Sequence, residues 1–148
     1  MRALIQRAKS GQVTIDCRTH GKIGPGLVIL LGITHADTAE DVDYLVNKCL
    51  HLRIFGDEEN RMNRSLLDIR GEVLIVSQFT LYGSAVKGRR PSFTAAAEPQ
   101  HAIRLYERFV AAFKAAGVVT ATGEFGAEMA VSIVNDGPVT MMLESPSA

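Results

Sequence analysis

The chain has 148 residues, and its 47% hydrophobic and 22% charged side chains are typical of one globular domain that can bury a sizeable core. Sixteen basic and 16 acidic residues give a formal net charge of zero, which argues against a protein held to nucleic acid mainly by bulk positive charge but allows a local basic patch. The two cysteines, Cys17 and Cys49, are too few for a secreted disulfide framework, so we expect buried free thiols in a reducing cytoplasm.

The chain shows no signal for export or for the membrane. Residues 1–7 lack the continuous apolar stretch of a secretory signal, and the longest apolar run, Leu27–Leu31, is far too short to cross a bilayer. We therefore expect a cytoplasmic protein without a membrane partner. Residues 145–148 are typical of a frayed tail.

The first third of the chain predicts three strands. Met1–Ala8 reads as the first, and residues 13–17 alternate apolar with polar side chains, which is the period of a half-buried second strand. Gly11 is expected to supply the turn between them, and the glycines and proline of residues 21–26 predict a loop. The apolar run Leu27–Leu31 then predicts a strand that is buried on both faces.

The next segment changes to helical periodicity. Thr38 and Asp41 are placed as a helix N-cap and an acid in the first turn. Apolar residues recur at helical spacing after them, so we expect a helix from about Ala39 to Arg53. The polar segment Asp57–Arg64 predicts a loop.

A second central strand is predicted at Val73–Val76, and we expect it to run on into Ser77–Thr80. Residues 83–92 read as a loop. Pro99 fits the first turn of a second helix, and Gly117 fits the position just after its last turn.

The end of the chain predicts three more strands, at residues 118–122, 129–134 and 139–143, with Asp136-Gly137-Pro138 as a turn between the last two. The order is then three strands, a helix, a strand, a helix and three strands. This order predicts a single mixed α/β domain over residues 1–148, not a doubly wound nucleotide fold.

Several motifs of known chemistry are missing. The sequence contains no Gly-x-Ser-x-Gly elbow and no phosphate-binding glycine loop. Its four histidines are scattered without metal-ligand spacing, so we expect neither a metal nor a cofactor. A serine or cysteine triad is open only through residues that folding brings together.

Two short segments can carry chemistry. Ser77, Gln78, Phe79 and Thr80 follow a buried strand, at the kind of strand end where ligands commonly bind, and their backbone N–H groups can stabilise an oxyanion. Alternatively, they simply terminate a strand. In the second segment, Asn135–Thr140, the proline lacks an N–H, and its bond to Gly137 can be cis at modest cost, which directs carbonyl groups rigidly.

Together the segments Ser77–Leu81 and Asn135–Thr140 resemble the two signature motifs of D-aminoacyl-tRNA deacylases. The resemblance extends from the first residue to about Leu143, and further similar stretches lie at residues 1–7, 21–32, 53–55, 62–63 and 90–93. Each motif alone is weak, whereas their order and spacing in a chain of this length are specific.

The resemblance implies a small α/β domain with a barrel-like mixed β-sheet and two main helices, which works as a homodimer with its active site at the subunit interface. It implies a cis bond between Gly137 and Pro138 that reaches into the partner's pocket, beside the Ser77–Thr80 segment. Carbonyl oxygens there would clash with an L side chain, while D-aminoacyl and glycyl groups fit. Arg7 would hold the Gly-Pro pair in place; by itself Arg7 reads as a strand arginine with a solvated head.

The implied reaction is hydrolysis of the ester that joins an amino acid to the terminal ribose of tRNA. A threonine nucleophile at Thr80 needs an adjacent base, and the sequence names none. We therefore favour oxyanion binding by backbone N–H groups around Phe79 and Thr80, with assistance from the substrate's 2′-hydroxyl, while Ser77 and Gln78 shape the pocket.

The tRNA partner requires positive charge near the pocket, for which Lys87, Arg89 and Arg90 are the candidates. The alternative is a solvated loop, just as Phe79 alone fits a plain core aromatic. For the whole protein, the alternatives are a non-catalytic module that binds RNA ends, and a related deacylase that edits an L-amino acid. The latter predicts a trans Gly-Pro bond and no supporting arginine, yet Arg7 is present.

Overall fold

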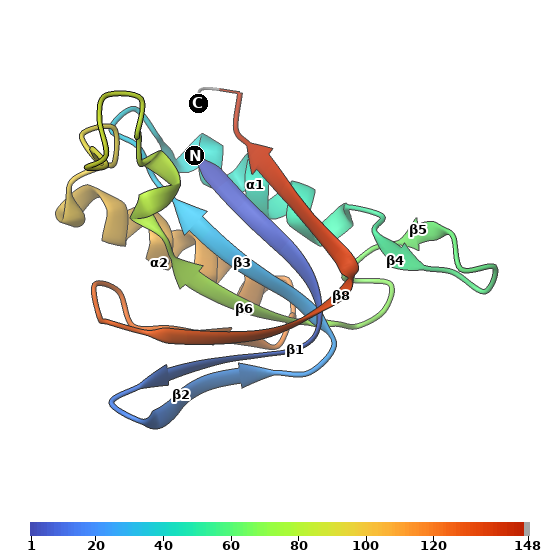
Figure 1. Ribbon diagram of the computed structural model, residues 1–148. Helices are drawn as coiled ribbons and strands as arrows, with labels where there is room; N and C mark the ends of the chain where they lie inside the picture. Colours follow the sequence, from blue (N-terminus) through green and yellow to red (C-terminus); the bar gives the residue numbers. More distant parts are fainter. Residues whose placement is uncertain (147–148) are drawn as a thin grey trace.

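A computed structural model describes residues 1–146 of the chain. It confirms a mixed α/β fold with two main helices, which cover one face of a curled sheet (Figure 1). The elements in order are β1 (Arg2–Ile15), β2 (Arg18–Ile23), β3 (Gly26–Gly32), α1 (Ala39–His51), β4 (Phe55–Gly56), β5 (Met62–Arg64), β6 (Glu72–Ser77), the 3-10 helix η1 (Phe79–Tyr82), α2 (Pro99–Ala115), β7 (Thr120–Thr122) and β8 (Ala130–Glu144).

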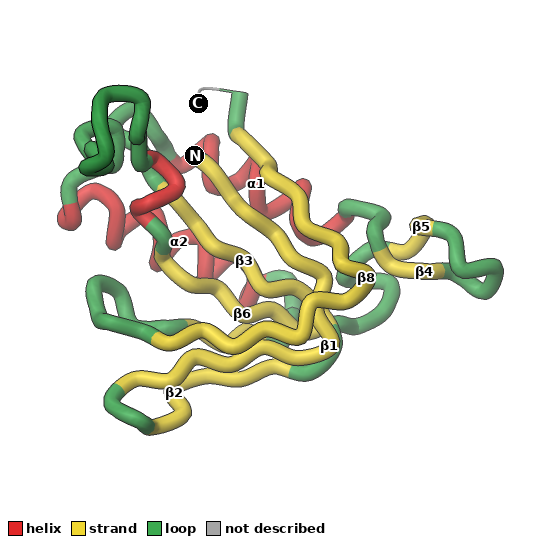
Figure 2. The backbone as a smooth tube through the Cα atoms, viewed as in Figure 1, coloured by secondary structure: helices red, strands yellow, loops and turns green. Residues whose placement is uncertain are grey.

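The main sheet has the order β2-β1-β3-β6-β7, with β8 on the other side of β1. Strands β3, β6 and β7 are parallel, because helical connections return the chain to the same edge, and the remaining pairs are antiparallel. The long strands β1 and β8 bend together, so that the sheet curls (Figure 2). Gly21 of β2 lies so close to β7 that a Cβ there would be 2.6 Å from the carbonyl oxygen of Thr122, and the sheet is therefore nearly closed into a barrel.

Two hydrophobic cores follow from the alternation of side chains along the strands. Odd-numbered residues of β1 and β3 face the helices and pack with the fully buried Phe109 and Phe113 of α2. Val28 points to the other face, into the curl of the sheet. The prediction that Leu27–Leu31 is buried on both faces is thereby confirmed, and the second core contains Ala8, Val13, Ile23, Val28, Leu74 and Val76.

The predicted turn at Gly11 is wrong. Gly11 lies inside the continuous strand β1, where a Cβ would be 2.7 Å from a methyl group of Val28, so the glycine permits close packing instead of a turn. The chain reverses at Asp16 and Cys17, both with positive φ, and β2 then occupies part of the segment predicted as loop. Cys17 is consequently exposed, while Cys49 is a buried free thiol as expected.

The helix signals are confirmed with small shifts. Asp41 accepts a hydrogen bond from the backbone N–H of Thr38 at 2.8 Å, which completes a capping box at the start of α1. Helix α1 ends at His51 because Leu52 is extended, and α2 begins at Pro99 as predicted. The segment predicted as loop after α1 instead contains the short β4–β5 hairpin.

Two predicted strand features differ from the structure at the motif segments. The chain leaves the strand conformation after Ser77 and forms η1, so the predicted continuation of the strand to Thr80 is wrong. The Asp136–Pro138 segment is not a hairpin turn either, because β8 continues through it and stays paired with β1 on both sides. Between the pairs Gln6–Thr140 and Ala8–Asn135, four residues of β8 oppose one residue of β1, which produces a bulged bend.

The two ends of the described chain meet in the protein interior. The Met1 amino group forms an ion pair with Asp37 at 2.5 Å and a hydrogen bond to Ser145 Oγ at 2.8 Å, and both charged groups are fully buried. The prediction that Ser145 belongs to a frayed tail is therefore wrong, while residues 147–148 of that predicted tail lie outside the described residues. Within residues 1–146, no helix is long and apolar enough to span a membrane.

Candidate active site

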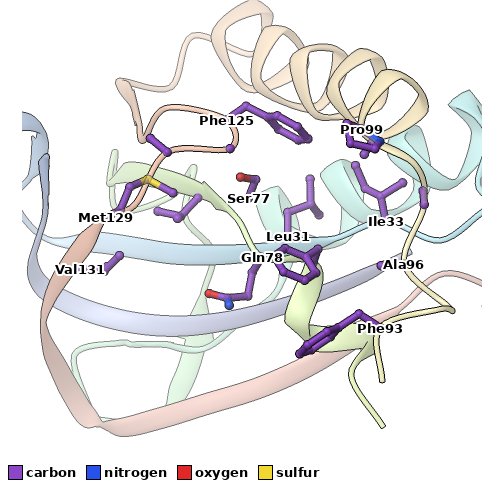
Figure 3. A pocket seen from close by; sticks show the side chains of 16 residues that line it. Leu31, Ile33, Ser77, Gln78, Phe93, Ala96, Pro99, Phe125, Met129 and Val131 are labelled. Carbon is purple, nitrogen blue, oxygen red and sulfur yellow. The ribbon is translucent and has the colours of Figure 1, made fainter. Parts of the chain in front are cut away.

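A cavity of about 580 Å³ opens at the carboxyl ends of β3 and β6. The start of α2 and the loop between β7 and β8 form its other walls (Figure 3). Most of its lining is apolar, with Ser77 and Gln78 as polar contributions, and its larger side chains are Leu31, Ile33, Phe93, Pro99, Phe125 and Met129. A mainly apolar cavity with a few polar groups is the usual form of a small-molecule site.

Three residues of the predicted segment, Ser77, Gln78 and Phe79, line one rim of this cavity, and Thr80 follows directly after them, outside the lining. Ser77 pairs with Leu31 in the parallel sheet, and the backbone N–H of Gln78 donates to the carbonyl oxygen of Leu31 at 2.7 Å, which fixes where the strand ends. The side chain of Ser77 lies among the residues that line the cavity, between Phe125 and Leu31 in the view of Figure 3. The amide of Gln78 donates to the hydroxyl of Thr80.

The backbone N–H groups of Phe79 and Thr80 are free donors. Because these residues begin a 3-10 helix, their N–H groups have no partner within the helix, and among residues 1–146 none of the hydrogen bonds satisfies them. The first bonded N–H is that of Leu81, which donates to the carbonyl oxygen of Gln78 at 3.2 Å. Two neighbouring donors at the rim of an apolar cavity can bind a negatively charged oxygen.

Phe79 is not a core aromatic, since its side chain is 57% exposed. Its ring packs edge-on against Phe93, with 5.1 Å between the ring centroids, and so extends the apolar wall of the cavity outward. Thr80 is also exposed, and within the described residues its hydroxyl has no histidine or carboxylate as a hydrogen-bond partner. The arrangement therefore supplies oxyanion donors but no base for a threonine nucleophile.

The second predicted segment is held firmly by its own chain. The bond between Gly137 and Pro138 is cis. The Arg7 guanidinium donates to the carbonyl oxygens of Asp136 at 3.2 Å and Ile54 at 2.6 Å, and it forms an ion pair with the Asp136 carboxylate at 3.3 Å. Since its side chain is only 15% exposed, Arg7 is not an arginine with a solvated head.

Gly137 itself has no room for a side chain. Its φ is +123°, and a Cβ would be 3.0 Å from Arg7 Nη2 and 2.9 Å from the side chain of Val139. The amide of Asn135 donates to the carbonyl oxygens of Arg7 at 2.8 Å and Val139 at 3.1 Å, which closes the base of the bend. The carbonyl groups of the bend are therefore held in fixed directions.

One chain does not bring the two segments together. The bend lies beside Arg7, which pairs with Leu27 at the start of β3, whereas Ser77 pairs with Leu31 at its end. Four residue steps along β3 and three strand spacings across the sheet place the segments on the order of 20 Å apart. In Figure 1 the bend of β8 lies on the right of the sheet and η1 lies on its left.

The three basic candidates lie in one loop next to the cavity. Lys87, Arg89 and Arg90 are exposed, and within residues 1–146 none of them forms an ion pair. Reciprocal hydrogen bonds of 2.8 Å between Ser84 and Ser92 close the base of this loop, directly before the cavity residue Phe93. Three unpaired positive charges are thus held near the rim.

The sequence analysis missed the cavity walls, because Phe93 lies in the loop before α2 whereas Phe125 and Met129 lie in the loop between β7 and β8, and only the fold brings these loops together. For Phe93 and Phe125, a large apolar side chain outside the predicted helices and strands was the single local signal, whereas Met129 was predicted to begin a strand. Within the described residues, no group of three or more histidine, cysteine or acidic side chains is placed to hold a metal ion. Burial raises the pKa of Cys49 to about 12, so this thiol stays protonated at neutral pH.

Comparisons with known proteins agree with this architecture. The family model for D-Tyr-tRNA(Tyr) deacylase matches residues 4–144. The D-aminoacyl-tRNA deacylases of Thermus aquaticus and Clostridioides difficile are 59% and 56% identical over 145 residues, which cover 98% of this chain and 95% and 97% of theirs.

Two solved structures share the fold. A c-Myc DNA unwinding element binding protein is 39% identical, with a TM-score of 0.93 over 99% of each chain. A probable eukaryotic D-amino acid tRNA deacylase, 21% identical, has a TM-score of 0.83 over 97% of this chain and 98% of its own, which shows the fold alone. The family match and the closely similar relatives confirm the resemblance found in the sequence: the chain belongs to the D-Tyr-tRNA(Tyr) deacylase family, the D-aminoacyl-tRNA deacylases.

Proposed function

We propose that the protein is a homodimeric hydrolase that cleaves the ester of D-aminoacyl-tRNA in the cytoplasm and also accepts glycyl-tRNA. The observation that carries the proposal is the pair of free N–H groups of Phe79 and Thr80 at the rim of the apolar cavity. An aminoacyl ester is already reactive, so a site that positions water and stabilises the tetrahedral oxyanion suffices for its hydrolysis.

In this mechanism the ester carbonyl oxygen accepts hydrogen bonds from the N–H groups of Phe79 and Thr80. Water adds to the carbonyl carbon, the 2′-hydroxyl of the terminal ribose assists the proton transfer, and the 3′-oxygen leaves with a proton. The products are a free amino acid and tRNA. Ser77 and Gln78 shape the pocket, and Thr80 contributes its backbone, because its hydroxyl has no base beside it in the described residues.

Selection against L-aminoacyl groups is assigned to the Gly137–Pro138 bend of the partner subunit. In its own chain the bend lies on the order of 20 Å from the cavity, so it needs a second copy to act on an ester. Its fixed carbonyl groups would meet an L side chain at the α-carbon, while a hydrogen or a D side chain avoids them. Arg7 holds these carbonyl groups in place.

Strand β8 supports the dimer. It pairs only with β1 in the described chain, so its other edge is free to meet a second subunit. Three of its large apolar side chains are exposed, Val134 by 54%, Met141 by 39% and Met142 by 44%. Burial of this strand between two copies would carry the bend of each subunit toward the other's cavity.

The basic loop is proposed to contact the phosphates of the tRNA acceptor stem through Lys87, Arg89 and Arg90. These charges lie beside the cavity that takes the aminoacyl end. Phosphate contacts position RNA without reading its bases, so we expect broad tolerance of tRNA sequence.

The decisive test is deacylation of D-tyrosyl-, L-tyrosyl- and glycyl-tRNA by the purified protein. We expect release of D-tyrosine and glycine and little release of L-tyrosine. Binding of the charged tRNA without release would instead indicate a module that only binds RNA ends, and preferred release of L-tyrosine would indicate an L-specific editing enzyme.

The variant Thr80→Ala separates the two mechanisms, because it removes the hydroxyl but keeps the N–H. We expect kcat to change by less than about tenfold. A loss of several orders of magnitude would identify the hydroxyl as the nucleophile and contradict the backbone mechanism.

A further inference from the structure

The side chain of Arg2 has contacts that the proposed mechanism does not use. Arg2 of β1 pairs with Glu144 of β8 on one side and with Gly32 of β3 on the other. Residues paired across neighbouring strands point to the same face of a sheet, so these three positions lie side by side on one face. This face is the one on which η1 packs.

One guanidinium connects η1 with the end of β8. Arg2 Nε lies 2.7 Å from a carboxylate oxygen of Glu144, and Nη1 donates to the carbonyl oxygen of Leu81 at 2.9 Å. The guanidinium carbon also lies over the ring of Tyr82, 4.7 Å from its centroid. Figure 1 shows why these contacts are possible, since β1 starts beside the end of β8 and close to η1.

The short helix η1 needs such a contact to stay in place. Its last carbonyl groups have no partner inside the helix, and Arg2 supplies one for Leu81. Below it, Gly32 leaves no side chain between η1 and β3, because a Cβ there would be 3.0 Å from Leu81 Cβ and 3.1 Å from the carbonyl oxygen of Gln78. The helix therefore packs directly on the backbone of Gly32 and is held at its end by Arg2.

We propose that Arg2 is a positioning residue for catalysis: its guanidinium, oriented by Glu144, holds η1 so that the N–H groups of Phe79 and Thr80 meet the oxyanion. The proposal rests on the proposed function, since it concerns those same N–H groups. The planar fork of arginine contacts a carboxylate, a carbonyl oxygen and a ring at once, whereas lysine replaces only part of this set.

The test compares Arg2→Gln, Arg2→Lys and Glu144→Gln with the matched control Arg108→Gln. Arg108 forms a similarly exposed ion pair with Asp43, between α2 and α1. Each variant is measured for kcat and KM on D-tyrosyl-tRNA, for subunit assembly by sedimentation, for thermal unfolding, and for amide hydrogen exchange of residues 78–83.

We expect Arg2→Gln to lower kcat by roughly 10- to 100-fold with KM within about twofold, since a displacement near 1 Å has effects of this size. Arg2→Lys should recover part of kcat, and Glu144→Gln should lower kcat less than Arg2→Gln does. The double variant that carries both Arg2→Gln and Glu144→Gln should show no further loss of kcat beyond Arg2→Gln alone. Exchange of residues 78–83 should accelerate in Arg2→Gln and stay unchanged in Arg108→Gln. A protein that is merely less stable would not show this local change.

Unchanged kcat in Arg2→Gln, or unchanged exchange of residues 78–83, would overturn the proposal. Dissociation of the variant into monomers would also overturn it, because Arg2 would then act through the interface. If Arg2→Gln fails to fold, Glu144→Gln alone decides, and wild-type kcat in that variant would contradict the role of Arg2. Failure of the proposed function is distinguishable, because the unmodified protein would then release no D-tyrosine.

Discussion

The two segments that carry the family motifs are built in opposite ways. The Ser77–Thr80 segment borders a cavity whose walls come from residues of its own chain, and its free donors lie at the rim of that space. The Asp136–Pro138 bend is just as firmly held, by Arg7 and Asn135, yet it lies on an edge strand on the order of 20 Å away. The first segment borders a cavity that can bind a ligand, and the second is a rigid bend on an edge strand that can reach a neighbouring subunit. A two-fold dimer whose active sites are shared between subunits requires both features.

The ion pairs that hold the two regions in place differ in how deeply they are buried. At the cavity end, the fully buried ion pair between Met1 and Asp37 fixes the loop that follows β3. At the bend, the pair between Arg7 and Asp136 is partly exposed, and Arg7 donates to carbonyl groups of the bend and of Ile54. Loss of the first anchor should therefore reduce stability, and loss of the second should reduce selectivity.

The largest effect that we expect is the loss of folding stability in the variant Asp37→Asn. It leaves the Met1 ammonium group buried without its counter-charge, which should lower the free energy of unfolding by about 3–5 kcal/mol. Urea unfolding measures this directly. The control Asp43→Asn breaks the exposed pair with Arg108 and should cost less than about 1 kcal/mol. Equal losses in both variants would remove the distinction between the two anchors.

Arg7→Gln should change which substrate is cleaved. With the bend loosened, we expect kcat/KM for L-tyrosyl-tRNA to rise by about 100-fold, while the value for D-tyrosyl-tRNA falls by less than about tenfold. The control Arg53→Gln removes an exposed arginine that also donates to a backbone carbonyl group, that of Asn63 at 3.0 Å, and should leave the ratio unchanged. An unaltered D-to-L ratio in Arg7→Gln would show that this arginine does not support selection.

Neutralising Lys87, Arg89 and Arg90 together, each to glutamine, should act on tRNA binding. We expect KM to rise by about tenfold with little change in kcat. The slope of log(kcat/KM) against log salt should flatten by about 0.7–0.9 for each phosphate that the loop no longer neutralises. Lys114→Gln, at the far end of α2 from the cavity, is the control. An unchanged salt slope would favour the alternative of a solvated loop.

The smallest effect concerns the tyrosines packed near the cavity end. Burial raises the pKa of Tyr82 and Tyr106 to about 12, so the folded state keeps protons that the unfolded state loses above pH 10. This contribution to stability is fully present below pH 10 and is lost as the pH rises through about 12. Urea unfolding at pH 8 and pH 11 should show the fall.

At pH 8, replacing each of the two tyrosines by phenylalanine should have a different cost in the free energy of unfolding. Tyr106→Phe loses the hydrogen bond to the carbonyl oxygen of Ile75 and should cost about 1 kcal/mol, whereas Tyr82→Phe should cost less than about 0.5 kcal/mol, because the buried hydroxyl of Tyr82 has no partner among the described residues. An equal cost would mean that the hydroxyl of Tyr82 is bound after all.

Local sequence patterns were sufficient for much of the fold. The helical period of apolar residues located both helices, the Thr38–Asp41 pair located the N-cap of α1, and the continuous apolar run Leu27–Leu31 located the central strand β3. Local patterns gave wrong predictions where a glycine permits close packing between strands. Gly11 reads as a turn, but its missing side chain makes room for Val28, a neighbour that only the assembled sheet provides. Likewise, Asp136-Gly137 reads as a hairpin turn, yet pairing with β1 on both sides keeps the chain running as one bent strand.

The candidate site was predictable only in part. The order and spacing of two motifs identified the family, which the comparisons confirm. The roles of Ser77–Thr80 and of Gly137–Pro138 remain predictions that the geometry supports. The cavity walls and the contacts of Arg2 could not be predicted from the sequence, because they join residues that are far apart in the chain, such as Arg2 and Leu81.

The central claim is that each cavity is completed by the bend of the other subunit, and a heterodimer with one working cavity tests it most directly. One subunit carries Ser77→Phe, which fills its cavity, and the other carries Arg7→Gln, which loosens its bend. The open cavity then belongs to the second subunit, and the intact bend to the first. The account predicts the D-to-L ratio of the unmodified protein; the ratio of the Arg7→Gln homodimer would contradict it, because each cavity would then be served by its own bend.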